Sequence, residues 1–341
     1  MENKELNQKT SKPYISQRNW IEIMALLFLA ITFISLLVGS VSISPGQIFR
    51  MLFDWEHTKA MRIMLYVRLP RVMGAVFAGA GLAVAGAIIQ SVLNNSLAGP
   101  NIIGVNAGAG FAVVLFGALF PLSYAALPFI AFLGALLTVL LVYFVARKTG
   151  ASKLTLVLSG IAINSLLNAA SDAVITFVPD ALLNSYSFRL GGLSGINSNV
   201  LIPACICITI GVIAAFCLHN EMDILSLGED TAKSLGLGVA KYRFLLLVVA
   251  AVLAGASVSF AGLLGFVGLI VPHMARLLVG AEGKYLIPMS TLMGAAFLTL
   301  CDLFSRKLFA PYDISVGIVL AFLGAPFFLY LLMQKKGRGT L

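Results

Sequence analysis

The sequence predicts an all-α, polytopic integral membrane protein with about ten transmembrane helices. Apolar residues make up 60% of the 341 residues, charged residues make up 11%, and the mean hydropathy is +0.98. Soluble domains are usually about a quarter charged. Nearly charge-free stretches long enough to span a bilayer recur along the whole chain. We therefore assign the length to one membrane domain instead of two soluble ones.

The first apolar run, residues 21–41, follows a basic segment and superficially resembles a secretory signal. It is longer than the apolar part of a signal peptide, and residues 42–45 make a poor cleavage site. We interpret it as an uncleaved first span. Allowing about 20 residues per span, we expect helices near residues 20–41, 64–93, 102–120, 125–147, 153–178, 199–218, 242–262, 266–280, 285–306 and 313–334.

The expected helix at 266–280 is short. Three glycines precede or begin it and Pro272 lies within it, so a half-helix or a re-entrant turn buried in protein is plausible. We expect residues 1–19 to form a cytoplasmic segment, residues 20–334 a single transmembrane domain, and residues 335–341 a cytoplasmic tail.

The distribution of basic residues predicts the topology. With both termini in the cytoplasm, 15 of the 23 Lys and Arg residues lie on the inner side, as the positive-inside rule requires. Arg68, Arg71 and Arg306 oppose the rule at the outer ends of their helices. They therefore suggest an acidic target, either an anionic substrate or carboxylates on a docking protein, or else guanidinium groups that snorkel to headgroups.

Several classes of function are disfavoured. The net charge of +9 is explained by topology, so no nucleic-acid partner is expected. The four cysteines show no paired metal or disulfide spacing, His273 is a lone histidine, and no catalytic constellation is evident. No G-x-x-x-x-G-K-[ST] phosphate loop occurs. We therefore expect neither an enzyme nor a cofactor site in this chain, so any ATP must be hydrolysed by another subunit.

Residues 219–243 form the largest polar insertion. Within them, Leu227 to Gly236 predict a short helix between two glycine stops, with Asp230 and Thr231 in its first turn. Such a helix on the cytoplasmic side is suited to docking into a groove on a soluble partner. The alternative is a helix that rests on lipid headgroups.

A polar stripe marks the helix expected at 153–178. Asn164, Asn168 and Asp172 recur at steps of four and share one face. An ionised Asp costs about 2.5–3.5 kcal/mol at the centre of a membrane helix, so this face should meet a wet cavity or another helix. This face could line a transport path or form hydrogen bonds with another helix, and the sequence does not decide between the two. Asp172 is also compatible with a secondary transporter that couples transport to protons.

Six motifs occur in order along nearly the whole chain: RLPR at 68–71, GLA at 81–83 with Gly86 and Gln90, LA at 97–98 with Pro100 and GV at 104–105, LGEDTAKSLG at 227–236, GLIVPH at 268–273 with Arg276, and GIV at 317–319 with GAPFF at 324–328. Together they resemble the permease subunits of type II ABC importers for iron–siderophore complexes, heme and vitamin B12, the FecCD-type family with the BtuC-like permease fold.

The resemblance implies a ten-helix permease in the bacterial cytoplasmic membrane that pairs with a second permease. It also implies two ABC ATPases, which bind the ATP and Mg, and an extracytoplasmic binding protein. Arg68, Arg71 and Arg306 match arginines that dock the binding protein, and Asn164, Asn168 and Asp172 lie on the helix near the pathway. The matching ATPase-coupling residues are Leu227, Gly228, Glu229, Asp230, Ala232, Lys233, Leu235 and Gly236.

The resulting hypothesis is a ferric-siderophore importer permease that works by alternating access. A cobalamin or heme importer of the same family remains an alternative. An ion-coupled secondary transporter that uses Asp172 is the alternative from another class.

Overall fold

A computed structural model describes residues 16–38, 59–149, 152–308 and 312–336. Most of the expected cytoplasmic N-terminal segment and the end of the tail lie outside these residues. All regular secondary structure in the described part of the chain is helical. The all-α expectation is therefore confirmed.

Each of the ten expected helices has a counterpart. They are α1 (Gln17–Leu37), α4 (Leu69–Leu93), α5 (Val105–Leu119), α6 (Leu127–Lys148), α7 (Lys153–Phe177), α9 (Ser198–Cys217), α12 (Val239–Ala261), α13 (Val267–Val279), α14 (Gly283–Lys307) and α15 (Val316–Lys336). Seven helical segments in the described residues are long and apolar enough to cross a membrane, and α5, α13 and the Val316–Tyr330 part of α15 are shorter apolar helices.

Three further short helices lie between the longer ones. They are α8 (Asp180–Leu190), α10 (His219–Ser226) and α11 (Glu229–Ser234), and only α11 was expected as a short helix. Two 3₁₀ turns, Pro100–Ile103 and Tyr124–Ala126, precede α5 and α6. The chain therefore makes more turns at the ends of its spans than hydropathy alone indicates.

The span that contains α4 begins earlier than expected. α3 (Lys59–Ile63) runs through a π-helical turn, Met64–Arg68, directly into α4. Pro70 has no N–H to donate, and its ring crowds the carbonyl of the preceding turn. A π turn is a common way to absorb such a defect. Arg68 and Arg71 are consequently placed on either side of a change in helical pitch.

α13 is the expected half-helix, and its break lies at the glycines that precede it and not at Pro272, which was also expected to interrupt it. At 13 residues it rises about 20 Å, which is too short to cross the roughly 30 Å hydrocarbon layer. Pro272 lies inside the helix without ending it. The chain leaves regular structure at Gly262 to Phe266 instead, where Gly262 (φ 72°) and Phe266 (φ 65°) adopt positive φ.

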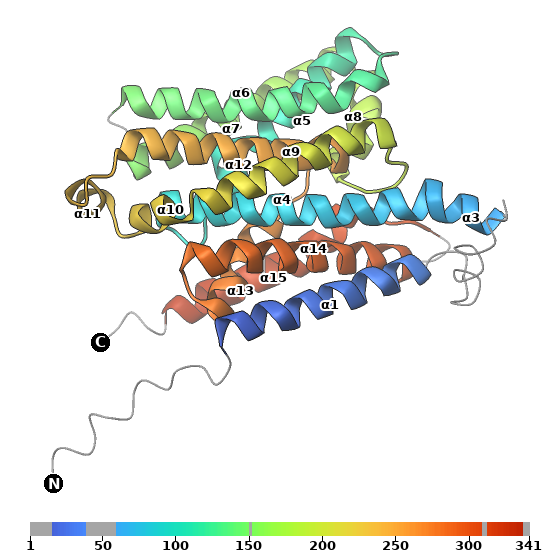
Figure 1. Ribbon diagram of the computed structural model, residues 1–341. Helices are drawn as coiled ribbons and strands as arrows, with labels where there is room; N and C mark the ends of the chain where they lie inside the picture. The colour runs from blue at the N-terminus through green and yellow to red at the C-terminus, as the bar shows by residue number, and fades with distance from the viewer. Residues whose placement is uncertain (1–15, 39–58, 150–151, 309–311, 337–341) are drawn as a thin grey trace.

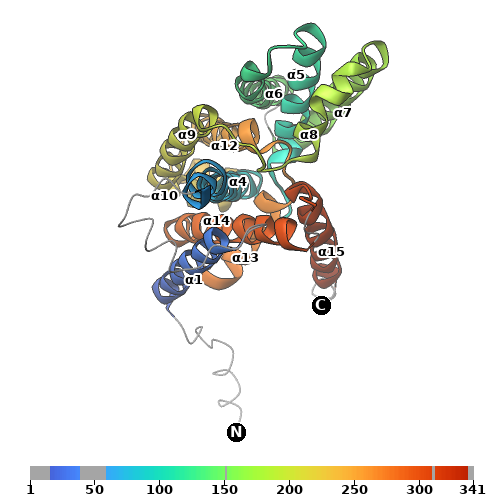
Figure 2. The same ribbon diagram turned by 90° about the vertical axis from the view of Figure 1, so that its right-hand side faces the viewer.

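α4 is the central helix of the bundle. It packs against α9 and α12 on one side and against α13 and α14 on the other (Figure 2). α1 packs on the side of α14 that faces away from α4. α5 to α8 form a separate group, which contacts the rest of the bundle mainly where α6 packs against α12 (Figure 1). In the most apolar 18-residue stretch of the segment that contains α4, Met61–Leu93, 83% of the residues are buried, against 22% in the corresponding stretch of α7. α4 is therefore the core of the bundle, whereas α7, like α1, is largely exposed.

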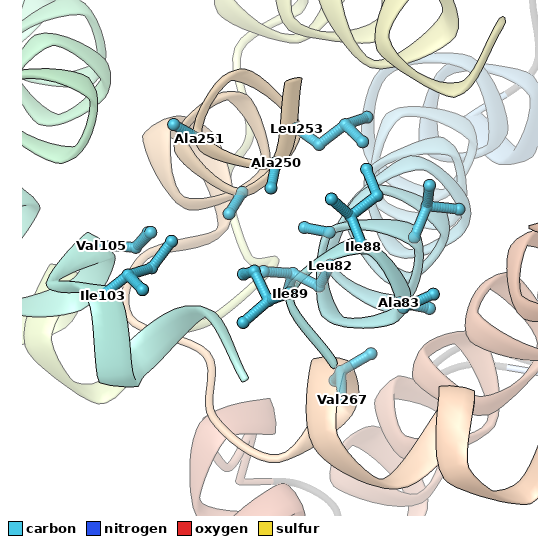
Figure 3. Packing of buried hydrophobic residues seen from close by; sticks show 14 of the residues in the cluster. Leu82, Ala83, Ile88, Ile89, Ile103, Val105, Ala250, Ala251, Leu253 and Val267 are labelled. Carbon is cyan, nitrogen blue, oxygen red and sulfur yellow. The ribbon is translucent and has the colours of Figure 1, made fainter. Parts of the chain in front are cut away.

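Small residues allow this close packing. A Cβ added at Gly79 would overlap the backbone of Gly294 in α14, and one added at Gly86 would overlap the backbone of Gly268 in α13. Larger apolar side chains of α4, such as Leu82 and Ile88, fill the remaining space toward α12 (Figure 3). Without a hydrophobic driving force between helices in lipid, such close backbone approach is a main source of helix association.

The described ends of the chain lie on one side of the bundle. α1 begins and α15 ends at the same end as α11, at the left of Figure 1, whereas α3 lies at the opposite end. This arrangement agrees with an even number of crossings. We call the α11 end the inner end and the α3 end the outer end, following the predicted topology.

Gly86→Val should destabilise the folded protein, because the added side chain must separate α4 from the backbone of α13. Overpacking of this kind costs about 1–3 kcal/mol or more, so we expect a lower thermal midpoint in detergent, measured by size-exclusion stability assays. Gly110→Ala is the matched control, since a Cβ there meets its nearest neighbour, Leu263, at an ordinary 3.4 Å. Equal midpoints for Gly86→Val and wild type would contradict the packing described here.

Candidate functional site

The three outer arginines converge on one buried cluster. Arg71, in the first turn of α4, donates from Nε to Asp302 Oδ1 of α14 at 2.8 Å. Its Nη1 and Nη2 donate to the two carboxylate oxygens of Asp313 at 2.6 and 3.0 Å. Ser194 accepts from Arg71 Nη1 at 3.0 Å and donates to Asp313 at 2.7 Å. Arg71 therefore ties α4 to α14 and to the segments that precede α9 and α15.

Arg306 and Arg68 complete the cluster. Arg306 Nε lies 3.0 Å from Asp302 Oδ2, and its Nη2 donates to Ser35 Oγ of α1 at 2.6 Å. Arg68 Nη1 donates to the carbonyls of Leu36 and Leu37, each at 2.9 Å. Both arginines thus satisfy polar groups near the end of α1, where the last four carbonyls of a helix lack partners within that helix.

The cluster changes the interpretation of the basic residues that oppose the topology rule. Arg68 and Arg71 are 4% and 9% exposed, and Asp302 is fully buried. The acidic groups with which these arginines were expected to pair therefore include two carboxylates of this same chain, Asp302 and Asp313. The sequence did contain a signal for the first, because Asp302 and Arg306 are four residues apart on one helix. Docking of a binding protein by these arginines stays a prediction.

Asp313 lies outside the helices, and its environment is electrostatically mixed. Partial burial acts to raise its pKa, but hydrogen bonds from Arg71 and Ser194 outweigh burial and hold the pKa below its usual range. A cavity of about 1150 Å³ opens beside Arg71, Ser194 and Asp313 and continues past Tyr124 and Tyr186. The charged cluster therefore forms part of the wall of an outer cavity, not a projecting surface.

The predicted helix between two glycines is present at the inner end. α11 begins after Gly228 (φ 108°) and is followed by Gly236 (φ 81°). A Cβ has free space at both positions, so the positive φ values explain the glycines. Leu227 and Leu235 flank the helix and are 60% and 61% exposed. These two exposed apolar side chains are available for contact with a partner at this end of the bundle.

The remaining predicted coupling residues have different environments. Ala232 is buried, whereas Asp230 and Lys233 are exposed. Glu229 accepts from Arg243 Nη2 of α12 at 2.8 Å and lies 2.9 Å from Lys233 Nζ. The hydrogen bond from Arg243 is the main reason that the pKa of Glu229 is lowered. Glu229 thus fixes α11 to α12 and pairs with the exposed Lys233, while Asp230 lies exposed on the surface.

A second contact ties this hairpin to α14. Asp223, in α10, accepts from the backbone N–H of Gly283 through both carboxylate oxygens, at 2.8 and 3.0 Å. Gly283 is the first residue of α14, so Asp223 satisfies a free N–H of that helix and faces the positive end of its dipole. Residues 219–243, which we call the coupling hairpin, are therefore fastened to both α12 and α14.

The polar stripe of α7 lies on the exposed flank. Asn164 Nδ2 donates to the carbonyl of Asn101 at 2.8 Å. Asn168 and Asp172 are exposed, and within the described residues the Asp172 carboxylate has no hydrogen bond or ion pair. Asn164 and Asn168 contribute to a second cavity, of about 240 Å³, but Asp172 does not. The stripe thus combines one packing contact with an open polar face.

Metal binding and acid–base catalysis find little support in this geometry. Among the described residues, no group of three or more His, Cys, Asp or Glu side chains could hold a metal ion. The described carboxylates with close basic partners form ion pairs either within one helix, as Glu22 does with Arg18, or between helices, as Asp302 does with Arg71. The arrangement offers a packed helical core, a polar flank and a polar hairpin at one end of the bundle, which are features of a multi-pass membrane protein.

Comparison with known proteins identifies the family of transporters that this chain resembles. Residues 26–334 match the model of the FecCD transport family. The Fe(3+)-citrate import system permease YfmE of Bacillus subtilis is 36% identical over 96% of this chain and 98% of its own. The iron(3+)-hydroxamate import system permease FhuG of the same organism is 37% identical over 97% of this chain and all of its own.

A solved structure agrees with the sequence comparisons. An inward-facing metal-chelate type ABC transporter matches 93% of this chain and 99% of that chain, with a TM-score of 0.81 and 30% identity. The chain belongs to the FecCD transport family of ABC permeases. The fold predicted from the motifs is thereby confirmed.

Asp302→Asn should lower the stability of the protein strongly. The substitution leaves Arg306 without a carboxylate in a buried site and removes one of the two carboxylates of Arg71. Breaking a buried ion pair by removing one partner costs about 3–5 kcal/mol. We expect a clear fall in the thermal midpoint, with Asp172→Asn as the exposed control. A double variant with Arg306→Gln should lose less than the sum of the single losses, and additive losses would contradict the pairing.

Glu229→Gln should loosen the coupling hairpin. We expect hydrogen exchange in residues 229–243 to accelerate about threefold to tenfold, as loss of a partly exposed ion pair predicts. The exposed Asp230→Asn is the matched control. Because the folded-state pKa of Glu229 is lowered, its stabilisation is present above the ordinary Glu pKa and is lost as pH falls through the lowered value. After correction for intrinsic rates, protection that is independent of both Glu229 and pH would refute this role.

Proposed function

We propose that this chain is the permease subunit of an ABC importer that carries ferric-siderophore or related ferric chelates across the bacterial cytoplasmic membrane. The observation that carries the proposal is full-length similarity to permeases named for Fe(3+)-citrate and iron(3+)-hydroxamate import. The two relatives differ in ligand chemistry yet share iron(III) as the cargo. Iron chelates as a class are therefore better supported than any single siderophore.

The energy source is a pair of ABC ATPases that bind ATP and Mg and dock at the coupling hairpin. Leu227 and Leu235 supply the apolar contacts, and Asp230 and Lys233 supply polar contacts at the rim. A short helix that presents apolar side chains to a groove is a common mode of recognition. Glu229 and Ala232 act from within the hairpin, the first through Arg243 and the second by packing against the bundle. Both termini then lie in the cytoplasm.

The transport path runs along the exposed flank of α7. Asn168 and Asp172 would be costly to expose to lipid, so a second permease subunit covers this flank and encloses a wet path between the two copies. The open polar face of α7 and its low burial support this assignment. Co-purification would show whether the second permease is another copy of this chain or a paralogue.

The binding protein docks at the outer end, over the cavity beside Arg71 and Asp313. Arg68, Arg71 and Arg306 contribute by fixing the shape and positive charge of this end, and any direct contact with acidic residues of the partner requires sharing them with Asp302 and Asp313. ATP-driven closure of the ATPases would move the coupling hairpin. Movement of α14, about 37 Å long from its 25 residues, would carry the change toward the outer cluster.

Leu235→Asp should abolish transport by disrupting ATPase docking. We expect uptake of ⁵⁵Fe-labelled ferric citrate or ferric hydroxamate into proteoliposomes to fall at least about tenfold, because a charge in an apolar groove costs more than about 1.4 kcal/mol. Leu122→Asp, at the exposed opposite end, is the matched control. Labelled heme and cobalamin are tested in parallel. Uptake that persists without any ATPase subunit would refute the importer assignment and favour ion coupling.

A further inference from the structure

The cavity of about 240 Å³ on the flank has an unusual lining. It lies between α5, α7 and the end of α8, which are neighbours in both views of the bundle (Figures 1 and 2). Its polar lining consists of Asn101, Asn106, Asn164, Asn168, Ser171 and Arg189. Phe111, Val114 and Leu263 form part of the apolar lining. Four amide side chains and one cation in so small a space indicate a site that recognises a polar group.

Two of these amides leave an acceptor unused. Asn164 donates from Nδ2 to the carbonyl of Asn101 at 2.8 Å, and Asn106 donates from Nδ2 to the carbonyl of Leu264 at 3.3 Å. Because a carbonyl can only accept, both amide orientations are fixed by their partners. Asn106 Oδ1 and Asn164 Oδ1 are therefore the free atoms, and both are buried without a hydrogen-bond partner in the structure. A buried acceptor without a donor costs about 1–3 kcal/mol.

Arg189 supplies hydrogen-bond donors and a positive charge beside these free acceptors. It lies in the last turn of α8, and within the described residues its guanidinium makes no hydrogen bond or ion pair. This distinguishes it from Arg68, Arg71 and Arg306, whose guanidinium groups are engaged in the outer cluster. A surface arginine is favoured near the negative end of its own helix, which would explain the charge of Arg189. It would not explain the two buried acceptors without a donor that lie beside Arg189.

We propose that this cavity is a cargo-binding subsite for an oxygen-rich anion that also carries hydroxyl groups or iron-bound water. Arg189 pairs with the anionic oxygens through several N–H donors. The hydroxyl or water hydrogens satisfy Asn106 Oδ1 and Asn164 Oδ1, and Asn168 adds an adaptable amide at the rim. Ferric citrate and other ferric hydroxycarboxylates have this chemistry, whereas a neutral ferric trihydroxamate lacks the negative charge.

This subsite rests on the proposed function, because it names the class of ferric chelate that the importer recognises. It predicts a permease that discriminates among chelates by charge while they pass. Asp172 would oppose an anion, but it does not line the cavity and makes no ion pair with Arg189. The competing outcome is a cavity that holds only ordered water, which would satisfy the same amides without any preference for cargo.

The test measures binding of ⁵⁵Fe(III)-citrate and of a neutral ⁵⁵Fe trihydroxamate to the permease–ATPase complex in nanodiscs, without binding protein. Arg189→Gln should weaken ferric-citrate binding about tenfold, as loss of a charge-assisted pair predicts, and should change trihydroxamate binding less than about twofold. Arg189→Lys, which keeps the charge, should restore most of the affinity. Arg62→Gln, an exposed arginine of α3, should leave both affinities unchanged.

Three results would overturn the subsite: no saturable ferric-citrate binding to the wild-type complex, no effect of Arg189→Gln, or an equal effect on both chelates. Asn164→Asp provides a second variant, because a carboxylate at the free acceptor position should repel the anion and weaken citrate binding selectively. Failure of the proposed function is distinguishable, since it would abolish ATP-driven uptake by wild-type protein. Failure of the subsite alone leaves that uptake intact.

Discussion

The close approach of helix backbones around α4 is the constraint on which the rest of the structure depends. Gly79 and Gly86 let α14 and α13 contact the backbone of α4 directly. Lipid offers no hydrophobic drive for helix association, so the fold relies on shape and on polar contacts at the helix ends. Once α4 has brought α12, α13 and α14 together, the ends of these helices are near enough for charged side chains to pair between them.

α14 shows how those pairs organise the protein. At its first residue, the N–H of Gly283 is held by Asp223 of the coupling hairpin. At its other end, Asp302 is held by Arg71 and Arg306. A single continuous helix thus joins the proposed ATPase contact to the wall of the outer cavity. The buried outer pairs cost much desolvation energy and stabilise little in net terms, so their value lies in fixing which helices meet and in what register.

Hydropathy and glycine positions predicted the ten helices and α11, because these depend on local composition. The sequence could not predict the partners of the charged residues, which depend on how distant helices pack. Arg71 was assigned to an external acidic surface, yet its partner Asp302 lies 231 positions away. Glu229 was predicted to contact the ATPase, and nothing in the sequence indicated that its carboxylate also pairs with Arg243 of the next helix. The ATPase contact stays a prediction. α8 was missed because residues 180–190 are too polar to resemble a span and follow α7 after only two residues.

The burial of polar groups separates scaffold from function in this chain. Arg68 and Arg71 are buried, and Arg71 and Arg306 share Asp302, so these arginines hold helices together. Docking of a binding protein by the same residues stays a prediction. Arg189, Asn168 and Asp172 are exposed on a flank that a bilayer would not tolerate without a covering partner. Buried polar groups without a partner in the protein must be satisfied by water, by a ligand or by another subunit. On α7 and α8, therefore, the unpaired polar groups lie where we propose that the second subunit and the cargo meet this chain.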